Sequence, residues 1–330
     1  MRPALRQITS KSAQALGLIL AVICLNFLLI HLAPGDPATV IVGESGAGDP
    51  VLLENIREQY GFDRSVVVQM VSYIGRVATG DLGESYFFNQ SVTSLISQRL
   101  WPTVLLVGTA LAFAVAAGTM VGIATARRPD SPFSHGATVL ALVGFSMPVF
   151  WTGIMLVILF ASTWQLLPVQ GWHDVNYGAG WLANSVDIAE HLILPAVTLG
   201  LIYLAQYSRL SRASMLEVLE SDYVRTARAK GLSERSVVYK HALRNAVIPV
   251  VTVVGLQFGA LLSGALLVET VFNWPGLGRL AFDSILRRDT AVLLGVLLVS
   301  SVMVIVANLV TDLLYTVIDP RIRVRERSDV

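Results

Sequence analysis

Six stretches of the chain, each about 20 residues long, consist almost entirely of apolar side chains. A helix of that length crosses the hydrocarbon core of a bilayer, so each stretch is able to span a membrane. Of the 330 residues, 54% are hydrophobic and only 14% are charged, a balance typical of integral membrane proteins. The sequence therefore predicts an all-α integral membrane protein whose six transmembrane helices form a single transmembrane domain. The predicted spans are residues 13–32, 102–124, 137–160, 191–210, 248–271 and 291–317.

Lysine and arginine are unevenly distributed between the segments that join these spans. If the N-terminus lies in the cytoplasm, the cytoplasmic segments hold 17 of the 24 basic residues and the opposite segments hold 7. Cytoplasmic loops carry the basic excess in membrane proteins. We therefore predict a multi-pass protein with both termini in the cytoplasm, an extracytoplasmic insert at residues 34–101 and a cytoplasmic loop at residues 211–247.

The extracytoplasmic insert is predicted to be structured. Two stretches with apolar residues at helical spacing, residues 51–60 and 66–77, lie between turn signals at residues 43–50 and at Gly80-Asp81-Leu82-Gly83. We expect short helices there rather than a sheet.

The chain lacks the residue patterns of several functional classes. Its net charge of +1 provides no basic excess to bind nucleic acid. No lysine follows a glycine, as a nucleotide-binding P-loop requires. The five histidines and the single Cys24 form no metal-binding spacing, and Ser263 has no histidine in a later span to act as its base. We therefore predict no catalytic site, no metal site and no cofactor on this chain.

The predicted cytoplasmic loop contains an unusual cationic segment, DYVRTARAKGLSERSVVYKHALRNAVIP, at residues 222–249. Apolar residues at helical spacing predict a helix over residues 215–230. Gly231 would end that helix at low conformational cost, because glycine tolerates a positive φ. Ser233 would cap a second helix, with Glu234 at its positive end. From charge alone, a solvated loop that only connects two spans is an equal alternative.

This segment resembles the "EAA" loop in the permease subunits of binding-protein-dependent ABC importers, in its peptide-permease variant. Arg225-Thr226-Ala227 and Gly231 carry the match, although Arg225 stands where the general pattern has Glu and residues 241–245 depart from it. Other motifs resemble the first, longer permease of the dipeptide, oligopeptide and nickel importers. These motifs are residues 31–37, 80–83 with Ser85, 144–153, 167–168, 194–196, 269–278 and 319–323.

The resemblance implies a type I ABC importer permease fold in the bacterial cytoplasmic (inner) membrane. Such a permease forms a heterodimer with a second permease subunit and binds two ATPase subunits, which bind ATP and Mg²⁺. An extracytoplasmic substrate-binding protein delivers the solute. The cationic segment would be the coupling helix that contacts an ATPase subunit. The implied coupling residues are Asp222, Arg225, Thr226, Ala227, Arg228, Lys230, Gly231, Glu234 and Lys240. Asp222 and Glu234 pair either with the partner or within the loop.

Two further groups of residues are candidates for transport functions. Polar residues inside spans would line the translocation path or form interhelical hydrogen bonds. They are Ser146, Gln257, Ser263, Asn308 and Asp312. Three tryptophans in the outer loops would receive the binding protein or act as interface anchors. They are Trp172, Trp181 and Trp274.

The predicted function is that of a permease that carries di- or oligopeptides. Nickel chelates and glutathione-like solutes are alternative substrates within the same family. A secondary transporter would carry inverted repeats and charge pairs in mid-span, and a membrane enzyme would need a nucleophile and base; the sequence displays neither pattern.

Overall fold

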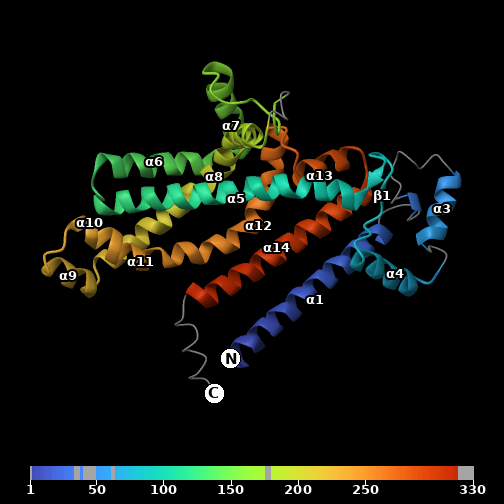
Figure 1. Cartoon of the computed structure of the whole chain (residues 1–330), viewed down its shortest axis with the longest axis horizontal. Helices are drawn as coiled ribbons and strands as arrows, with labels where there is room; N and C mark the ends of the chain where they lie inside the picture. The colour runs from blue at the N-terminus through green and yellow to red at the C-terminus, as the bar shows by residue number, and fades with distance from the viewer. Residues whose placement is uncertain (1, 33–37, 40–49, 61–63, 175–179, 319–330) are drawn as a thin grey trace. The chain divides into compact units, whose positions relative to one another are not determined.

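The computed structural model describes residues 2–32, 38–39, 50–60, 64–174 and 180–318. These residues are almost wholly helical (Figure 1). The chain divides into two compact units, Met1–Thr103 with Pro275–Val330, and Val104–Trp274. Helix α5 (Val92–Arg127) begins in the first unit and ends in the second.

The first unit is built on two long helices, α1 (Arg2–Leu32) and α14 (Thr290–Ile318), which pack against each other. Asn26 of α1 is buried and its Nδ2 donates a hydrogen bond to the Leu294 carbonyl oxygen at 3.0 Å. The His31 ring lies 2.8 Å from Gln69 Oε1 and so joins α1 to α4 (Val66–Ala78). Polar contacts of this kind fix the register of helices whose surfaces are otherwise apolar.

The insert after α1 contains the two short helices that the sequence predicts, α3 (Pro50–Tyr60) and α4. Outside those two stretches it also contains a small hairpin, β1 (Glu84–Ser85) paired antiparallel with β2 (Gln90–Ser91). Asn89, with φ of +50°, lets the chain reverse direction between these strands. Asparagine tolerates that conformation better than most residues.

A buried pair joins the hairpin to the start of α14. Ser85 Oγ donates a hydrogen bond to Asp289 Oδ2 at 2.5 Å, and Asp289 Oδ1 accepts one from the Val292 backbone N–H at 3.2 Å. Asp289 thereby also caps the helix, and both of its carboxylate oxygens are used. Helix α13 (Leu277–Leu286), which ends just before Asp289, packs on α14.

Asp289→Ala should therefore destabilise the protein by about 1–3 kcal/mol, because it leaves the Ser85 hydroxyl buried without its acceptor and removes the cap. The melting temperature of the purified protein in detergent is the measurement. Asp283→Ala is the matched control, since the Asp283 carboxylate is partly exposed and lies 3.8 Å from Arg279, a contact worth about 0–1 kcal/mol. Equal losses from the two variants would contradict the role given to Asp289.

The second unit contains the rest of α5 and the helices that lie between α5 and α13 in the sequence. Its elements are α6 (Pro132–Ser146), α7 (Val149–Leu156), the π-helix η1 (Val157–Thr163), α8 (Trp181–Leu219), α9 (Asp222–Ala229), α10 (Glu234–Ser236), the π-helix η2 (Val237–Ala242), α11 (Leu243–Ala246) and α12 (Ile248–Val271). Helix α8 packs against α6, α7 and α12. Fully buried apolar side chains, among them Leu199 and Leu261, form the core.

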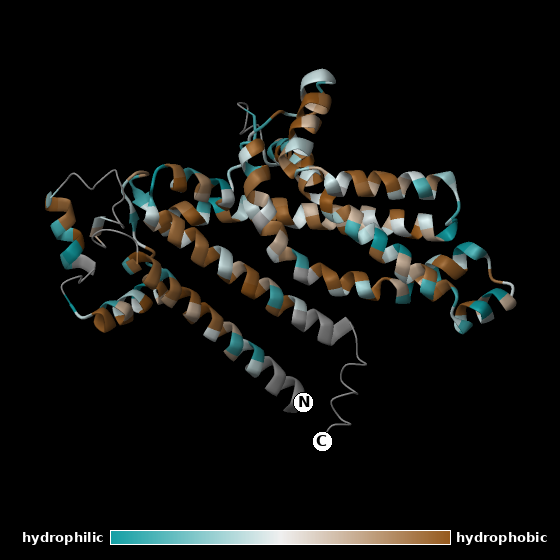
Figure 2. Cartoon of the chain, turned by 180° about the vertical axis from the view of Figure 1, so that it is seen from behind, coloured by the Kyte–Doolittle hydropathy of each residue, from teal (hydrophilic) through white to brown (hydrophobic). Residues whose placement is uncertain are grey.

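The long helices also carry apolar side chains on their exposed surfaces. Leu20, Leu140 and Val306 are examples, each about half exposed or more, and Figure 2 shows apolar residues along the length of these helices. A helix that is apolar on all sides suits a lipid environment or contact with other spans.

Among the described residues, four helices are long and apolar enough to cross a membrane, and the number rises to six if each of two bent pairs is one span. The span predicted at residues 137–160 corresponds to one of these pairs, with segments Pro132–Gly144 and Val149–Thr163 inclined at 111°. This span is therefore bent near Pro148. Pro148 has no backbone N–H and disfavours a helical conformation at Met147, which is extended with ψ of 136°.

Candidate functional site

The cationic segment begins where α8 ends. The predicted helix over residues 215–230 is interrupted, since α8 stops at Leu219 and α9 starts at Asp222. Ser221 between them is extended, with φ of −68° and ψ of 150°, and its Oγ donates a hydrogen bond to the Val218 carbonyl oxygen. Serine competes well with helix geometry in this way, which apolar spacing alone did not reveal.

The turn after α9 agrees with the sequence prediction. Gly231 has φ of +75° and follows Lys230, which caps α9. Ser233 caps the next helix, its Oγ accepting a hydrogen bond from the Ser236 backbone N–H at 3.4 Å. The segment is thus two short helices joined by a sharp glycine turn.

The inward face of α9 holds the helix in place. Val224 and Ala227 are buried in an apolar cluster together with Met215 of α8 and Val238 of η2. Ala227, predicted as a coupling residue, is therefore buried on the inner side of the helix.

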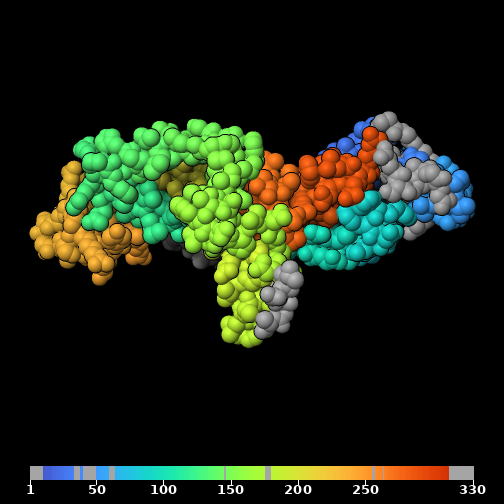
Figure 3. Space-filling view, turned by 90° about the horizontal axis from the view of Figure 1, so that it is seen from above, coloured from blue at the N-terminus to red at the C-terminus, as the bar shows by residue number. Residues whose placement is uncertain are grey.

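The outward face of the segment is exposed and mixed in character. We call it the coupling face; its exposed members are Asp222, Tyr223, Arg225, Thr226, Arg228, Lys230, Gly231, Leu232, Glu234, Arg235, Tyr239 and Lys240. In Figure 3 the segment that carries it, in orange, forms one end of its unit. Large apolar side chains among basic ones, such as Tyr223 and Leu232, are typical of a protein docking surface.

Two ion pairs lie within the coupling face. Arg225 is 3.7 Å from Asp222, and the Arg228 guanidinium makes a two-point contact with Glu234 at 2.9 and 3.2 Å. Arg228 also reaches the Leu219 carbonyl oxygen at 3.4 Å. The two-point contact spans the Gly231 turn and joins α9 to α10. Arg228 is thus engaged inside the segment, whereas the sequence analysis considered it for contact with a partner.

Hydrogen bonding to Arg228 lowers the pKa of Glu234, and the same contact raises the pKa of Arg228. Since the carboxyl pKa is depressed in the folded state, the pair stabilises the turn at neutral pH. That contribution is lost as the pH falls through the lowered pKa of Glu234.

Arg228→Glu should loosen the turn, because two carboxylates then face each other, while Arg228→Glu combined with Glu234→Arg should restore it. The pair is exposed, so a double-mutant cycle should measure an interaction of about 0–1 kcal/mol. Lys230→Glu is the comparison, since it changes the same charge without touching this contact. A reversed pair as unstable as the single variant would refute the contact.

The candidate path residues have different surroundings. Gln257 Nε2 donates a hydrogen bond to Gln206 Oε1 at 2.7 Å, which joins α12 to α8 as the interhelical alternative foresaw. Ser146 is exposed and donates to the Leu142 carbonyl oxygen at 2.9 Å, and Asn308 is exposed on α14. Gln206 was not among the predicted path residues, although a glutamine in an apolar span indicates either a path residue or an interhelical hydrogen bond. Ser263 and Asp312 lie in helices, but their side chains are outside the described residues.

The three tryptophans do not share an environment. Trp274 is 0% exposed and packs edge-on against Trp172, with ring centroids 4.7 Å apart. It therefore cannot serve as the docking residue that its loop position suggested; a large ring at the end of α12 stabilises the core instead. Trp181, at the start of α8, is 76% exposed and stays a candidate.

One group of metal-ligating side chains lies together in the part of the chain that the structure describes. It consists of Asp174, Asp187 and His191. The sequence analysis expected no metal site, because it searched for histidine and cysteine spacings and not for a loop carboxylate beside an i, i+4 pair.

Comparison with known proteins identifies the family. Residues 118–324 match the family described as binding-protein-dependent transport system inner membrane component, and residues 4–107 match the N-terminal family of such membrane components. The chain is 43% identical over 329 residues to the dipeptide transport system permease protein DppB of Escherichia coli K12, with 93% of this chain and 97% of that protein covered. It is 42% identical to the di/tripeptide transport system permease protein DppB of Pseudomonas aeruginosa, with 94% and 98% covered.

A solved structure shares the fold. A chain of the inward-facing MetNI methionine ABC transporter matches with a TM-score of 0.54 at 15% identity, covering 68% of this chain and 96% of that chain. The predicted all-α, type I ABC importer permease fold is thereby confirmed. The chain belongs to the family of inner-membrane components of binding-protein-dependent transport systems.

Proposed function

We propose that this chain is a permease subunit of an ABC importer that carries di- or oligopeptides across the bacterial inner membrane. The observation that carries the proposal is the 43% identity, over 93% of this chain, to a dipeptide permease. Two permeases of similar function from different bacteria align at nearly the same level, which favours peptides over nickel chelates or glutathione-like solutes.

The coupling face is the proposed contact with an ATPase subunit. A complete importer would contain a second permease subunit, two ATPase subunits that bind ATP and Mg²⁺, and an extracytoplasmic binding protein. ATP hydrolysis would take place on the partners, and this chain would hold no cofactor. Val224 and Ala227 pack α9 against the end of α8. A movement of the ATPase subunit against the coupling face would therefore be transmitted directly to the span formed by α8.

In the proposed orientation both termini and the coupling face are cytoplasmic. The insert at residues 34–101 and the stretch before α8 are then extracytoplasmic, where Trp181 would help to receive the binding protein. The predicted path residues that are exposed on this chain, Ser146 and Asn308, would meet either substrate or the second permease. Walls with few fixed charges suit peptides of varied sequence, because strong specific contacts would slow release.

The experiment is to purify the complex that contains this chain, identify its subunits and measure ATP hydrolysis in lipid nanodiscs. Peptide-loaded binding protein should stimulate hydrolysis more than unloaded binding protein does. Stimulation by a nickel chelate or glutathione, and not by peptide, would show that the substrate is one of these alternative solutes. Uptake by this chain alone, without ATPase subunits, would refute the importer.

A further inference from the structure

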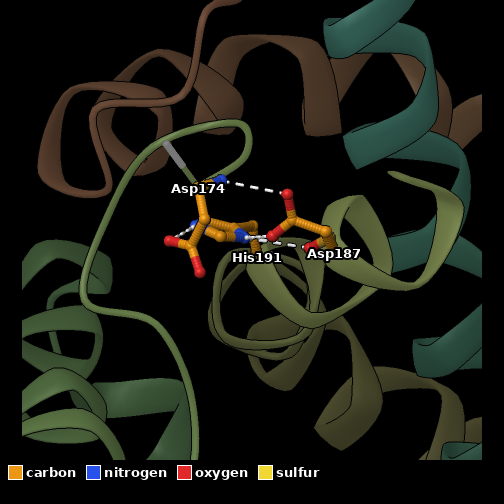
Figure 4. Close-up of side chains that lie close together, drawn as sticks. All are labelled: Asp174, Asp187 and His191. Atoms are coloured by element: carbon orange, nitrogen blue, oxygen red, sulfur yellow. Dashed lines mark hydrogen bonds and ion pairs between the residues drawn. The ribbon is translucent and has the colours of Figure 1, made fainter. Parts of the chain in front are cut away.

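The start of α8 carries a compact group of three side chains from two segments (Figure 4). Asp187 and His191 are four residues apart on one face of α8, and Asp174 lies on the stretch that leads to the helix. One ligand atom from each lies within 4.8 Å of the others. The group combines a buried ring, a half-buried carboxylate and an exposed one, since the side chains of His191, Asp187 and Asp174 are 2%, 19% and 76% exposed.

The stretch that carries Asp174 is held over the His191 ring. The Gly171 backbone N–H donates to the Phe272 carbonyl oxygen at 2.9 Å, and Trp172 packs against Trp274. Gly171 has φ of +104°, and a Cβ at that residue would lie 3.9 Å from His191 Cδ2. The Asp174 backbone N–H then donates to Asp187 Oδ2 at 3.0 Å, which fixes the orientation of the Asp174 residue relative to α8.

The two ring nitrogens of His191 have different partners. Nδ1 lies 2.9 Å from the Asp187 carbonyl oxygen and 3.1 Å from Asp187 Oδ1, so both neighbours are acceptors and Nδ1 carries the proton. Nε2 is the ring nitrogen that remains for a further partner. Among the described residues it makes no hydrogen bond, and its nearest charged neighbour is Asp174 Oδ1 at 3.6 Å. A cation held between Nε2 and the Asp174 carboxylate would join the buried ring to the exposed carboxylate.

The spacing of these two atoms fits a metal ion. With both bonds about 2.1 Å long, ligand atoms 3.6 Å apart subtend about 118° at the ion, close to the tetrahedral geometry that Zn²⁺ adopts. Histidines that bind metal through one nitrogen usually donate the other N–H to a carbonyl or carboxylate, as Nδ1 does here. Imidazole with carboxylates suits Zn²⁺ and its neighbours in the first transition series, whereas Ca²⁺ and Mg²⁺ prefer oxygen ligands alone.

We propose that Asp174, Asp187 and His191 form a binding site for a divalent transition-metal ion, with Zn²⁺ as the best fit. His191 Nε2 and an Asp174 oxygen bind the ion directly. Asp187 would supply the third ligand, since one of its carboxylate oxygens lies within 4.8 Å of the other ligand atoms, and its carbonyl oxygen accepts the Nδ1 proton. The fourth position is open to water, because Asp174 is exposed. The ion would tie the stretch before α8 to α8 itself.

The side of the membrane on which this site lies rests on the proposed function, which makes it extracytoplasmic. The ion would then come from outside the cytoplasm and would act on the surface near Trp181. The existence of the site does not depend on that orientation, so a direct binding measurement tests it independently of transport.

The test is a Zn²⁺ titration of the purified complex, carrying an affinity tag without histidine and first treated with EDTA. Bound metal is measured by mass spectrometry and affinity by calorimetry, and Co²⁺ reports a four-coordinate site through its visible spectrum. Loss of a residue that only supports a metal ligand typically weakens metal binding by roughly 10- to 100-fold. Asp174 is a proposed direct ligand, so we expect Asp174→Asn to weaken Zn²⁺ binding by at least that factor. Asp174 is exposed, so this variant should fold, and His191→Gln should abolish binding.

Glu190→Gln is the matched control, because it removes an exposed carboxylate one residue from His191 and outside the group. It should bind Zn²⁺ as the unaltered complex does. Equal binding by Asp174→Asn and the unaltered complex would overturn the site, as would the absence of any binding by the unaltered complex. A complex that binds Zn²⁺ at this group but shows no peptide-stimulated hydrolysis would refute the proposed function and leave the site intact.

Discussion

Replacing Gly122 with alanine should sharply destabilise the second unit. A Cβ at Gly122 would lie 2.6 Å from both the Ser208 carbonyl oxygen and Ser211 Cβ, and one at Gly118 would lie 2.8 Å from Tyr207 Cβ. Helices α5 and α8 therefore meet almost backbone to backbone, as small residues four apart permit in membranes. Since neither helix can yield locally, each added methyl group should cost about 1–3 kcal/mol.

The measurement is the melting temperature of the purified complex in detergent, followed by fluorescence-detected size exclusion. Gly108→Ala is the control on the same helix, because a Cβ there meets nothing within 4 Å. It should be neutral or stabilise by up to about 1 kcal/mol through helix propensity. If Gly108→Ala and Gly122→Ala lowered the melting temperature equally, the close approach of α5 to α8 at Gly122 would not explain the need for glycine there.

Gly231→Val should uncouple ATP hydrolysis from transport while leaving the spans folded. There is open space around Gly231, with nothing within 4 Å of a Cβ, so the difficulty is the backbone and not a clash. A β-branched residue at φ of +75° costs about 1–3 kcal/mol of strain. The turn would relax by moving α9 and α10, and the coupling face would lose its shape.

Peptide-stimulated ATP hydrolysis and peptide uptake in proteoliposomes measure this effect, and subunit composition shows whether the complex still assembles. Gly231→Asn is the control, because asparagine tolerates a positive φ and should keep most of the stimulation. If Gly231→Val kept normal peptide-stimulated ATP hydrolysis and uptake, the turn would not be required for coupling.

Hydrophobic patterning predicted the helices well where a single physical property decides them. Long apolar runs led to α1, α5, α8, α12 and α14, and the glycine and serine signals around Gly231 were correct. Patterning missed the interruption at Ser221, because one residue's backbone preference outweighs the apolar spacing around it.

The contacts that join distant parts of the chain were not visible in the sequence. Nothing in the spacing of Ser85 and Asp289, or of Gln206 and Gln257, indicates that each pair meets. Trp274 looked like a surface ring because it lies in a predicted loop, yet the chain folds back so that Trp172 covers it. Such pairs are decided by tertiary packing, which local sequence does not encode.

Helix α8 joins the two ends of the second unit with one continuous element. Its 39 residues extend about 58 Å at 1.5 Å per residue. Two of the proposed metal ligands, Asp187 and His191, lie in its first three turns, and Leu219 at its other end is followed within three residues by α9. An ion that favours one position of this helix over another would thus change the affinity of the coupling face for its partner. By thermodynamic reciprocity, the partner would change the affinity for the ion by the same factor.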